Sequence, residues 1–182
     1  MQVTLIPHPS TPCEAVDSID VFIETDANAL ALRYHVEGRA EEILLPEPRS
    51  SDRQDGLWQH TCFELFARSA LSTRYCELNF SPSTEWAAYD FDDYRAGMKR
   101  LPYPAIPQIH LTRDTHHVSL AVDVNHDVIA SIAGSEPRIA LAAVIEESSG
   151  RKSYWAMSHP SATPDFHHPD AFTLAIPSGV AR

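Results

Sequence analysis

Residues 56–66 combine a carboxylate with aromatic side chains in a stretch that reads as a β-strand. Side chains of a strand alternate between its two faces, so one face is predicted to carry the acid together with the aromatic rings. That face consists of Trp58, His60, Cys62, Glu64 and Phe66. Aromatic rings can contact the apolar side of a ligand while a carboxylate binds its hydroxyl groups. The stretch is therefore a candidate binding site.

A second polar strand face follows at residues 75–80, where Glu77 and Asn79 alternate with apolar residues. If the apolar residues of both stretches fill the core, Glu64, Glu77 and Asn79 lie together on the opposite face of one sheet. Such a face could offer hydrogen bonds to a ligand. The alternative is that these residues are simply the polar side of a half-exposed sheet, which alternation predicts without any function.

Two acids on neighbouring strands also raise the possibility of catalysis. Glu64 and Glu77 could act as acid and base on a glycosidic bond if the sheet set them at a suitable separation. That chemistry usually needs a deep cleft, and a chain of 182 residues without long insertions is better suited to holding a ligand. We therefore expect no catalytic residues and no enzymatic activity, with a small glycoside-active enzyme as an alternative.

Length and composition predict one soluble domain that covers residues 1–182. Hydrophobic residues make up 43% and charged residues 21%, and no apolar run approaches the roughly 18 residues of a membrane span. The first residues show no export signal, and three cysteines without C-x-x-C spacing suit a reducing compartment. A cytoplasmic location is expected, without a membrane partner.

The chain is acidic, with 14 Lys and Arg against 25 Asp and Glu and a formal net charge of -11. This charge repels polyphosphate, so nucleic acid is not an expected partner. It also disfavours anionic ligands at long range and directs any small-molecule hypothesis towards neutral or cationic compounds. Neutral sugars satisfy that constraint. The oligomeric state is left open.

Short segments of period-two alternation recur along the chain and predict an all-β fold. About eleven strands are expected, at residues 19–24, 30–36, 42–45, 63–67, 74–80, 86–91, 108–113, 117–124, 138–145, 153–157 and 172–176. Residues 127–133 could form one or two helical turns that stop at Gly134. The predicted architecture is an antiparallel β-sandwich, of the jelly-roll or immunoglobulin-like kind, with at most one or two short helices.

Ten histidines raise the question of a metal site, above all His159, His167 and His168 near the end of the chain. Their spacing does not complete a ligand triad on one predicted element. His116 and His117 open a strand, and solvated rings explain them. We therefore expect no metal ligands and no cofactor.

These stretches together resemble a DOMON-like domain related to the family 9 carbohydrate-binding modules. Trp58 followed by Glu64 is similar to the family's strand with a sugar-stacking tryptophan and a hydroxyl-binding glutamate. Asn79 fits the asparagine of the next strand, whereas Glu77 stands where the family has a basic residue. The stretch from Phe166 and His167 to Phe172 resembles the family's second stacking segment, with Phe166 in place of tryptophan.

The resemblance implies a non-catalytic domain that binds a carbohydrate or similar polyol between aromatic side chains. The candidate ligand-binding residues are Trp58, His60, Glu64, Glu77, Asn79, Phe166 and His167. Another branch of the DOMON grouping binds haem through axial Met and His, so an electron-transfer module that binds haem or metal is the alternative. Met98, Met157 and His159 are the residues it could use.

Overall fold

The computed structural model describes residues 1–26, 29–103, 105–134 and 137–176. These residues form twelve strands, one α-helix, α1 (His126–Ala133), and three 3₁₀ turns, η1 (Ala40–Glu42), η2 (Leu57–Gln59) and η3 (Pro169–Ala171). The strands are β1 (Gln2–Pro7), β2 (Val16–Thr25), β3 (Ala29–Gly38), β4 (Cys62–Ser69), β5 (Tyr75–Phe80), β6 (Trp86–Phe91), β7 (Lys99–Arg100), β8 (Gln108–Arg113), β9 (His117–Asn125), β10 (Pro137–Glu146), β11 (Lys152–Ala156) and β12 (Leu174–Ala175). No helix in these residues has the length and apolar character that crossing a membrane requires.

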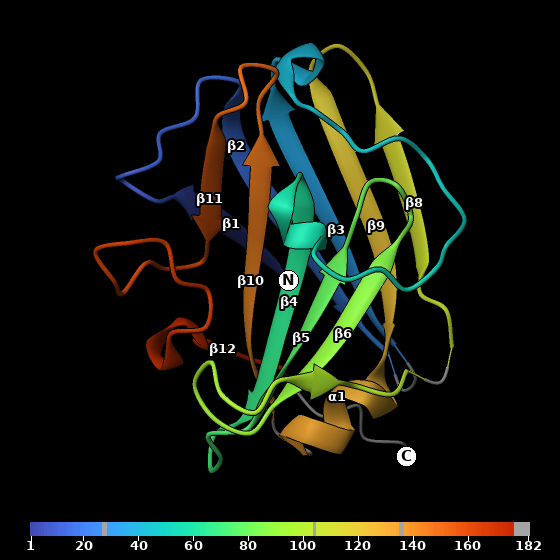
Figure 1. Cartoon of the computed structure of the whole chain (residues 1–182), viewed down its shortest axis with the longest axis vertical. Coiled ribbons are helices and arrows are strands. Elements are labelled where there is room, and N and C mark those ends of the chain that lie inside the picture. Colours follow the sequence, from blue (N-terminus) through green and yellow to red (C-terminus); the bar gives the residue numbers. More distant parts are fainter. Residues whose placement is uncertain (27–28, 104, 135–136, 177–182) are drawn as a thin grey trace.

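The strands form one curled antiparallel sheet in the order β7-β6-β5-β4-β10-β11-β1-β2-β3-β9-β8, with β12 paired to β10. Strand β1 turns the sheet over on itself, because residues 2–5 pair with β2 while Ile6 and Pro7 pair with β11. Two layers result: a front layer of β7, β6, β5, β4, β10 and β11, and a back layer of β2, β3, β9 and β8 (Figure 1). The predicted all-β antiparallel class is confirmed.

The core lies between the two layers and follows from strand alternation. Phe63 and Leu65 on β4 and Leu78 on β5 point inward from the front layer and belong to the same buried cluster as Leu120 and Val122 of β9. The predicted inward faces are all buried as expected, and they bury large apolar side chains, each of which stabilises the fold by roughly 1.5–3 kcal/mol. The other face of the front layer is thereby left to carry the polar residues of β4 and β5.

The predicted helix is present as α1. The Asn125 side chain accepts a hydrogen bond of 2.7 Å from the backbone N–H of Asp127 and so caps the first turn. The helix ends at Gly134, whose φ of 72° suits a residue without a Cβ. Buried Val128, Ile129 and Ile132 attach the helix to the end of the core.

Some predicted boundaries were wrong. Residues 56–66 are not one strand: Gly56 has a φ of 80°, η2 follows, and β4 begins only at Cys62. Trp58 therefore lies on a turn and not on a strand face. Residues 42–45 form no strand, since η1 reaches Glu42 and Ile43 makes a single isolated bridge. Strands β1 and β7 were not predicted.

The two layers are tied together beneath the polar face by Tyr34 of β3. Its hydroxyl donates a hydrogen bond of 2.8 Å to the backbone carbonyl of Glu64 on β4, and its ring contacts Phe63 at 5.0 Å between centroids. The tyrosine is fully buried, so no water can replace this bond. Tyr34 thus links the back layer to the backbone of β4 at Glu64 and helps to set the distance between the two layers there.

Replacing Tyr34 by Phe should lower the free energy of unfolding by about 1 kcal/mol, because the ring is kept and a buried hydrogen bond is lost. Urea unfolding followed by circular dichroism measures the change. Tyr94→Phe is the matched control, since its exposed hydroxyl donates to Asp165 and its loss should change stability by less than about 0.5 kcal/mol. Equal effects of the two variants would contradict the bridging role of Tyr34.

Candidate ligand-binding site

A cavity of about 740 Å³ lies on the outer face of the front layer. Its floor comes from β4, β5, β6, β10 and β11, and its sides come from η2, from the loop between β6 and β7, and from the segment that follows β11. The cavity is lined by Asp55, Trp58, Glu64, Glu77, Tyr89, Phe91, Arg95, Met98, Lys99, Arg100, Val144, Tyr154, Pro164, Phe166 and His167. Five of the seven predicted binding residues line it: Trp58, Glu64, Glu77, Phe166 and His167.

Strand register places the two acids of the floor beside each other. Glu64 of β4 is paired with Asn79 of β5, and Glu77 lies two residues before Asn79 on the same face. All three side chains are buried, with Glu64 only 3% exposed. The sequence predicted a shared face, but expected it to be wetter than it is. Both acids are buried although they line the cavity.

Burial keeps the two carboxyl groups from ionising easily. Desolvation raises the pKa of Glu64 well above its ordinary value, and the nearby Glu77 raises it further. Desolvation also raises the pKa of Glu77 to about 7, although a hydrogen bond of 2.7 Å from the Asn79 amide to Oε1 favours its charged form. Both effects favour the protonated form of Glu64, which can donate a hydrogen bond as well as accept one.

One carboxyl oxygen at the floor has no partner among the described residues. Oε1 of Glu64 is buried without a hydrogen bond, and Oδ1 of the neighbouring Asn79 is in the same condition. A buried polar atom left unpaired costs roughly 1–3 kcal/mol. A ligand hydroxyl that reached the floor of the cavity would remove this cost for Glu64.

His167 closes one side of the floor through a chain of contacts. The Tyr75 hydroxyl lies 2.7 Å from Nδ1 of His167 and receives a hydrogen bond of 3.2 Å from the backbone N–H of Arg95. In the tautomer in which the Tyr75 hydroxyl donates to Nδ1, the ring proton is on Nε2, which lies 3.7 Å from Oε2 of Glu77. Burial lowers the pKa of His167 to about 4, so the ring is neutral at neutral pH.

Aromatic side chains form the walls. Trp58 is 50% exposed on η2, whereas Phe166 is 9% exposed and packs against Phe66 and Tyr154. Phe91 stacks on Tyr75 at 4.6 Å with an interplanar angle of 4°. The walls therefore combine fixed rings near the floor with one exposed indole, which is the arrangement of a site that contacts the apolar side of a ligand.

Basic residues at the rim were missed by the sequence reasoning. Arg95, Lys99 and Arg100 come from the loop after β6 and from β7, and they are paired with Asp165, Asp92 and Asp55 at 2.8, 2.8 and 2.5 Å. The signal was available, because three of the 14 basic residues fall within six positions. Arg95 also has a φ of 52°, a left-handed conformation that residues other than glycine seldom adopt.

Comparison with known proteins gives similarity of fold without similarity of sequence. No family model matches the chain, and no curated protein matches it. Among solved structures, a protein from Bacteroides uniformis provisionally described as carbohydrate-binding aligns with a TM-score of 0.71 and 11% identity, over 95% of this chain and 84% of its own. A family 9 carbohydrate-binding module from Caldicellulosiruptor kristjanssonii, in complex with glucose, aligns with a TM-score of 0.54 and 13% identity, over 96% and 83%.

The predicted resemblance in fold is confirmed. At these identities the likeness concerns the fold of the family 9 modules and not the roles of single residues. The stacking role of Trp58 and Phe166 and the hydroxyl-binding role of Glu64 stay predictions, as does the wider DOMON relationship.

Two predicted binding residues do not line the cavity. His60 lies outside it, where Nδ1 is 2.7 Å from Oε2 of Glu146 and the side chain is 62% exposed. The reason is the turn at η2, which places His60 after the turn instead of on the strand face. Asn79 is fully buried on the same sheet face, where its amide donates a hydrogen bond of 2.7 Å to Oε1 of Glu77.

The residues considered for haem or metal are spread over different parts of the molecule. Met98 lines the cavity, while Met157 packs against the core between the layers. The His159 ring bonds through Nε2 to the backbone carbonyl of Ile6 at 2.8 Å. His168 bonds through Nδ1 to the backbone N–H of Asp170. Both histidines are thus engaged with backbone groups in the structure.

The buried acid pair predicts a specific dependence of stability on pH. Because the folded chain holds a proton on Glu77 up to a pKa of about 7, while the unfolded chain releases it near 4.5, stability should fall as pH rises through this window. Glu77→Gln removes the contribution, so the variant should gain roughly 1–3 kcal/mol relative to the wild type between pH 4 and pH 8.

Urea unfolding of both proteins at pH 4, 6 and 8 measures this difference. His167 acts in the opposite direction, since its lowered pKa reduces stability as pH falls from 6.5 to about 4, but it is present in both proteins and cancels in the comparison. Glu24→Gln, at the exposed end of β2, controls for the loss of one acidic side chain. Parallel pH profiles for wild type and Glu77→Gln would disprove a buried, proton-holding Glu77.

Proposed function

We propose that this chain binds a neutral saccharide or similar polyol in the cavity of the front layer, without turning it over. The observation that carries the proposal is the Glu64 carboxyl group, which is buried at the floor of an aromatic-walled cavity with Oε1 unpartnered. A hydrogen bond from a ligand hydroxyl to that atom would offset its desolvation.

The protonation state of the floor selects hydroxyl groups. A protonated Glu64 donates one hydrogen bond and accepts another, as a sugar hydroxyl also does, and Glu77 with a pKa of about 7 adds a stronger acceptor. An anionic ligand would meet the negative charge that Glu77 carries when it is ionised. A floor of this kind therefore suits a ligand with several neutral donors and acceptors.

The walls and rim suit the same ligand. Rings of Trp58, Tyr89 and Phe166 offer apolar surface for the C–H face of a pyranose. The cationic groups of the rim are neutralised by acidic partners, as in the Arg95–Asp165 and Arg100–Asp55 pairs. An entering ligand therefore meets neutral ion pairs at these two positions.

The fold comparison supports the proposal independently. The module of similar fold from Caldicellulosiruptor kristjanssonii is in complex with glucose, and the Bacteroides uniformis protein is also described in terms of carbohydrate binding. A shared fold alone does not transfer a ligand. Here it agrees with a cavity whose chemistry points to the same class of compound.

Trp58→Ala should weaken saccharide binding at least tenfold and leave the fold intact, because the indole is half exposed and its loss removes stacking surface and no core contact. Titration of mono- and oligosaccharides by calorimetry should give micromolar to millimolar dissociation constants in the wild type, which correspond to about -8 to -4 kcal/mol. Trp86 and Trp155 are buried, so a change in tryptophan fluorescence should be absent in the variant. Unchanged affinity in Trp58→Ala, or no binding across a broad panel, would refute the proposal.

A pair of substitutions at Glu64 tests the floor. Glu64→Leu removes the hydrogen-bonding group and should weaken binding by roughly 1–3 kcal/mol, whereas Glu64→Gln keeps one donor and one acceptor in the same volume and should weaken it less. Calorimetry of both variants measures the difference. Recovered ligand analysed by mass spectrometry should be unmodified; hydrolysed glycosides that disappear in Glu64→Gln and Glu77→Gln would establish the enzymatic alternative.

A further inference from the structure

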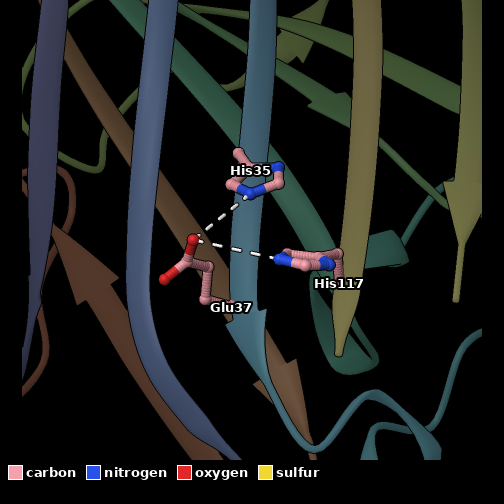
Figure 2. A group of neighbouring side chains, drawn as sticks. All are labelled: His35, Glu37 and His117. Atoms are coloured by element: carbon pink, nitrogen blue, oxygen red, sulfur yellow. Dashed lines mark ion pairs between the residues drawn. The ribbon is translucent and has the colours of Figure 1, made fainter. Parts of the chain in front are cut away.

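Three potential metal ligands meet on the outer face of the back layer, away from the cavity. They are His35 and Glu37 of β3 and His117 of β9, and their ligand atoms all lie within 4.8 Å of one another (Figure 2). Nε2 of His35 is 3.6 Å and Nε2 of His117 is 3.9 Å from the same oxygen, Oε1 of Glu37. Figure 2 shows both rings directed towards that carboxylate.

Strand geometry explains why these residues converge. His35 and Glu37 are two positions apart on β3 and so share its outer face, while Glu37 and His117 are directly paired between β3 and β9. The rings of His35 and His117 are stacked with centroids 5.0 Å apart. The backbone hydrogen bonds between β3 and β9 therefore hold all three Cα atoms in place. Only side-chain rotations are needed to bring the three ligand atoms to metal-binding distances.

A second feature prepares His117 for this role. Its Nδ1 lies 3.2 Å from Oδ1 of Asp114, which also accepts hydrogen bonds of 2.8 Å from the backbone N–H groups of His116 and His117. A carboxylate at Nδ1 fixes the proton there and leaves the Nε2 lone pair free on the side that faces Glu37. Histidines that bind metals commonly have such a carboxylate at the other ring nitrogen.

We propose that His35, Glu37 and His117 bind a divalent transition-metal ion of the zinc class, with Asp114 as the residue that positions His117. Two imidazoles and one carboxylate form a recognised zinc ligand set, and three protein ligands leave one coordination position open to solvent. Bonds of about 2.1 Å at tetrahedral angles require ligand atoms roughly 3.4 Å apart. The separations of 3.6 and 3.9 Å are close to this value.

The chemistry of the surface also favours a cation. Glu37 and Asp114 are acidic, and Asp20 of β2 lies opposite His35 in the register of β2 and β3. The whole chain has a formal net charge of -11. The group lies on the opposite layer from the saccharide cavity and the core separates the two. The metal-binding proposal and the saccharide-binding proposal can therefore be tested independently of each other.

The test uses the untagged chain, stripped with a chelator and titrated with ZnCl₂ by calorimetry at pH 7.5. We expect one saturable site per chain and a rise in melting temperature on zinc addition. His35→Ala and His117→Ala should each weaken zinc binding at least tenfold, and Glu37→Gln should weaken it as well. His110→Ala is the matched control, because His110 is exposed on β8 of the same layer and outside the group.

Asp114→Asn tests the positioning role separately. Asn retains an oxygen for the two backbone N–H groups, so the turn should be kept, while zinc affinity should fall by about tenfold. Circular dichroism checks that each variant is folded, and Co²⁺ binding followed by visible absorption reports the coordination of the ion. Zinc binding that is not saturable, or that is the same in wild type, His35→Ala and His117→Ala, would overturn the proposal.

Discussion

The burial of two carboxyl groups on one sheet face is the constraint on which the site depends. An ionised carboxylate in an apolar environment is strongly unfavourable, so such a group must be protonated, paired or bound to a ligand. Glu77 receives a hydrogen bond from Asn79 and faces His167. Burial favours the protonated form of Glu64, whose Oε1 has no partner among the described residues. Both acids line the cavity, and burial in its floor raises both pKa values.

The rigidity of this floor comes from the opposite side of the same strands. Alternation sends Phe63, Leu65 and Leu78 into the core, and Tyr34 of the back layer bonds to the backbone of Glu64 itself. A side chain on a strand whose other face is fully packed cannot withdraw from its position without disturbing the core. Glu64 is therefore held in place by residues that never touch the cavity.

Sequence patterns predicted the parts of the molecule that obey a local rule. Period two located the inner strands and put Glu64 and Glu77 on one face, and Gly134 marked the end of the helix. Features set by tertiary contacts were not predictable in this way. The depth of burial of Glu64 depends on loops distant in sequence, the turn at Gly56 displaced Trp58 and His60 from the expected strand face, and two-residue β7 is too short to show a period.

The group of His35, Glu37 and His117 escaped prediction for a related reason. Residues 35 and 117 are 82 positions apart, and only the pairing of β3 with β9 brings them together. In both groups, the alternation of side chains along a strand places the polar residues on the outer face of a layer. The two groups differ in how deeply these residues are buried. The acids of the front layer are buried, which is the basis of the proposed binding of neutral hydroxyl groups, whereas the ligand atoms of the back layer belong to half-buried and exposed side chains. In the proposed metal site, the anionic carboxylate of Glu37 and the oriented imidazole of His117 would offset the loss of the ion's hydration shell.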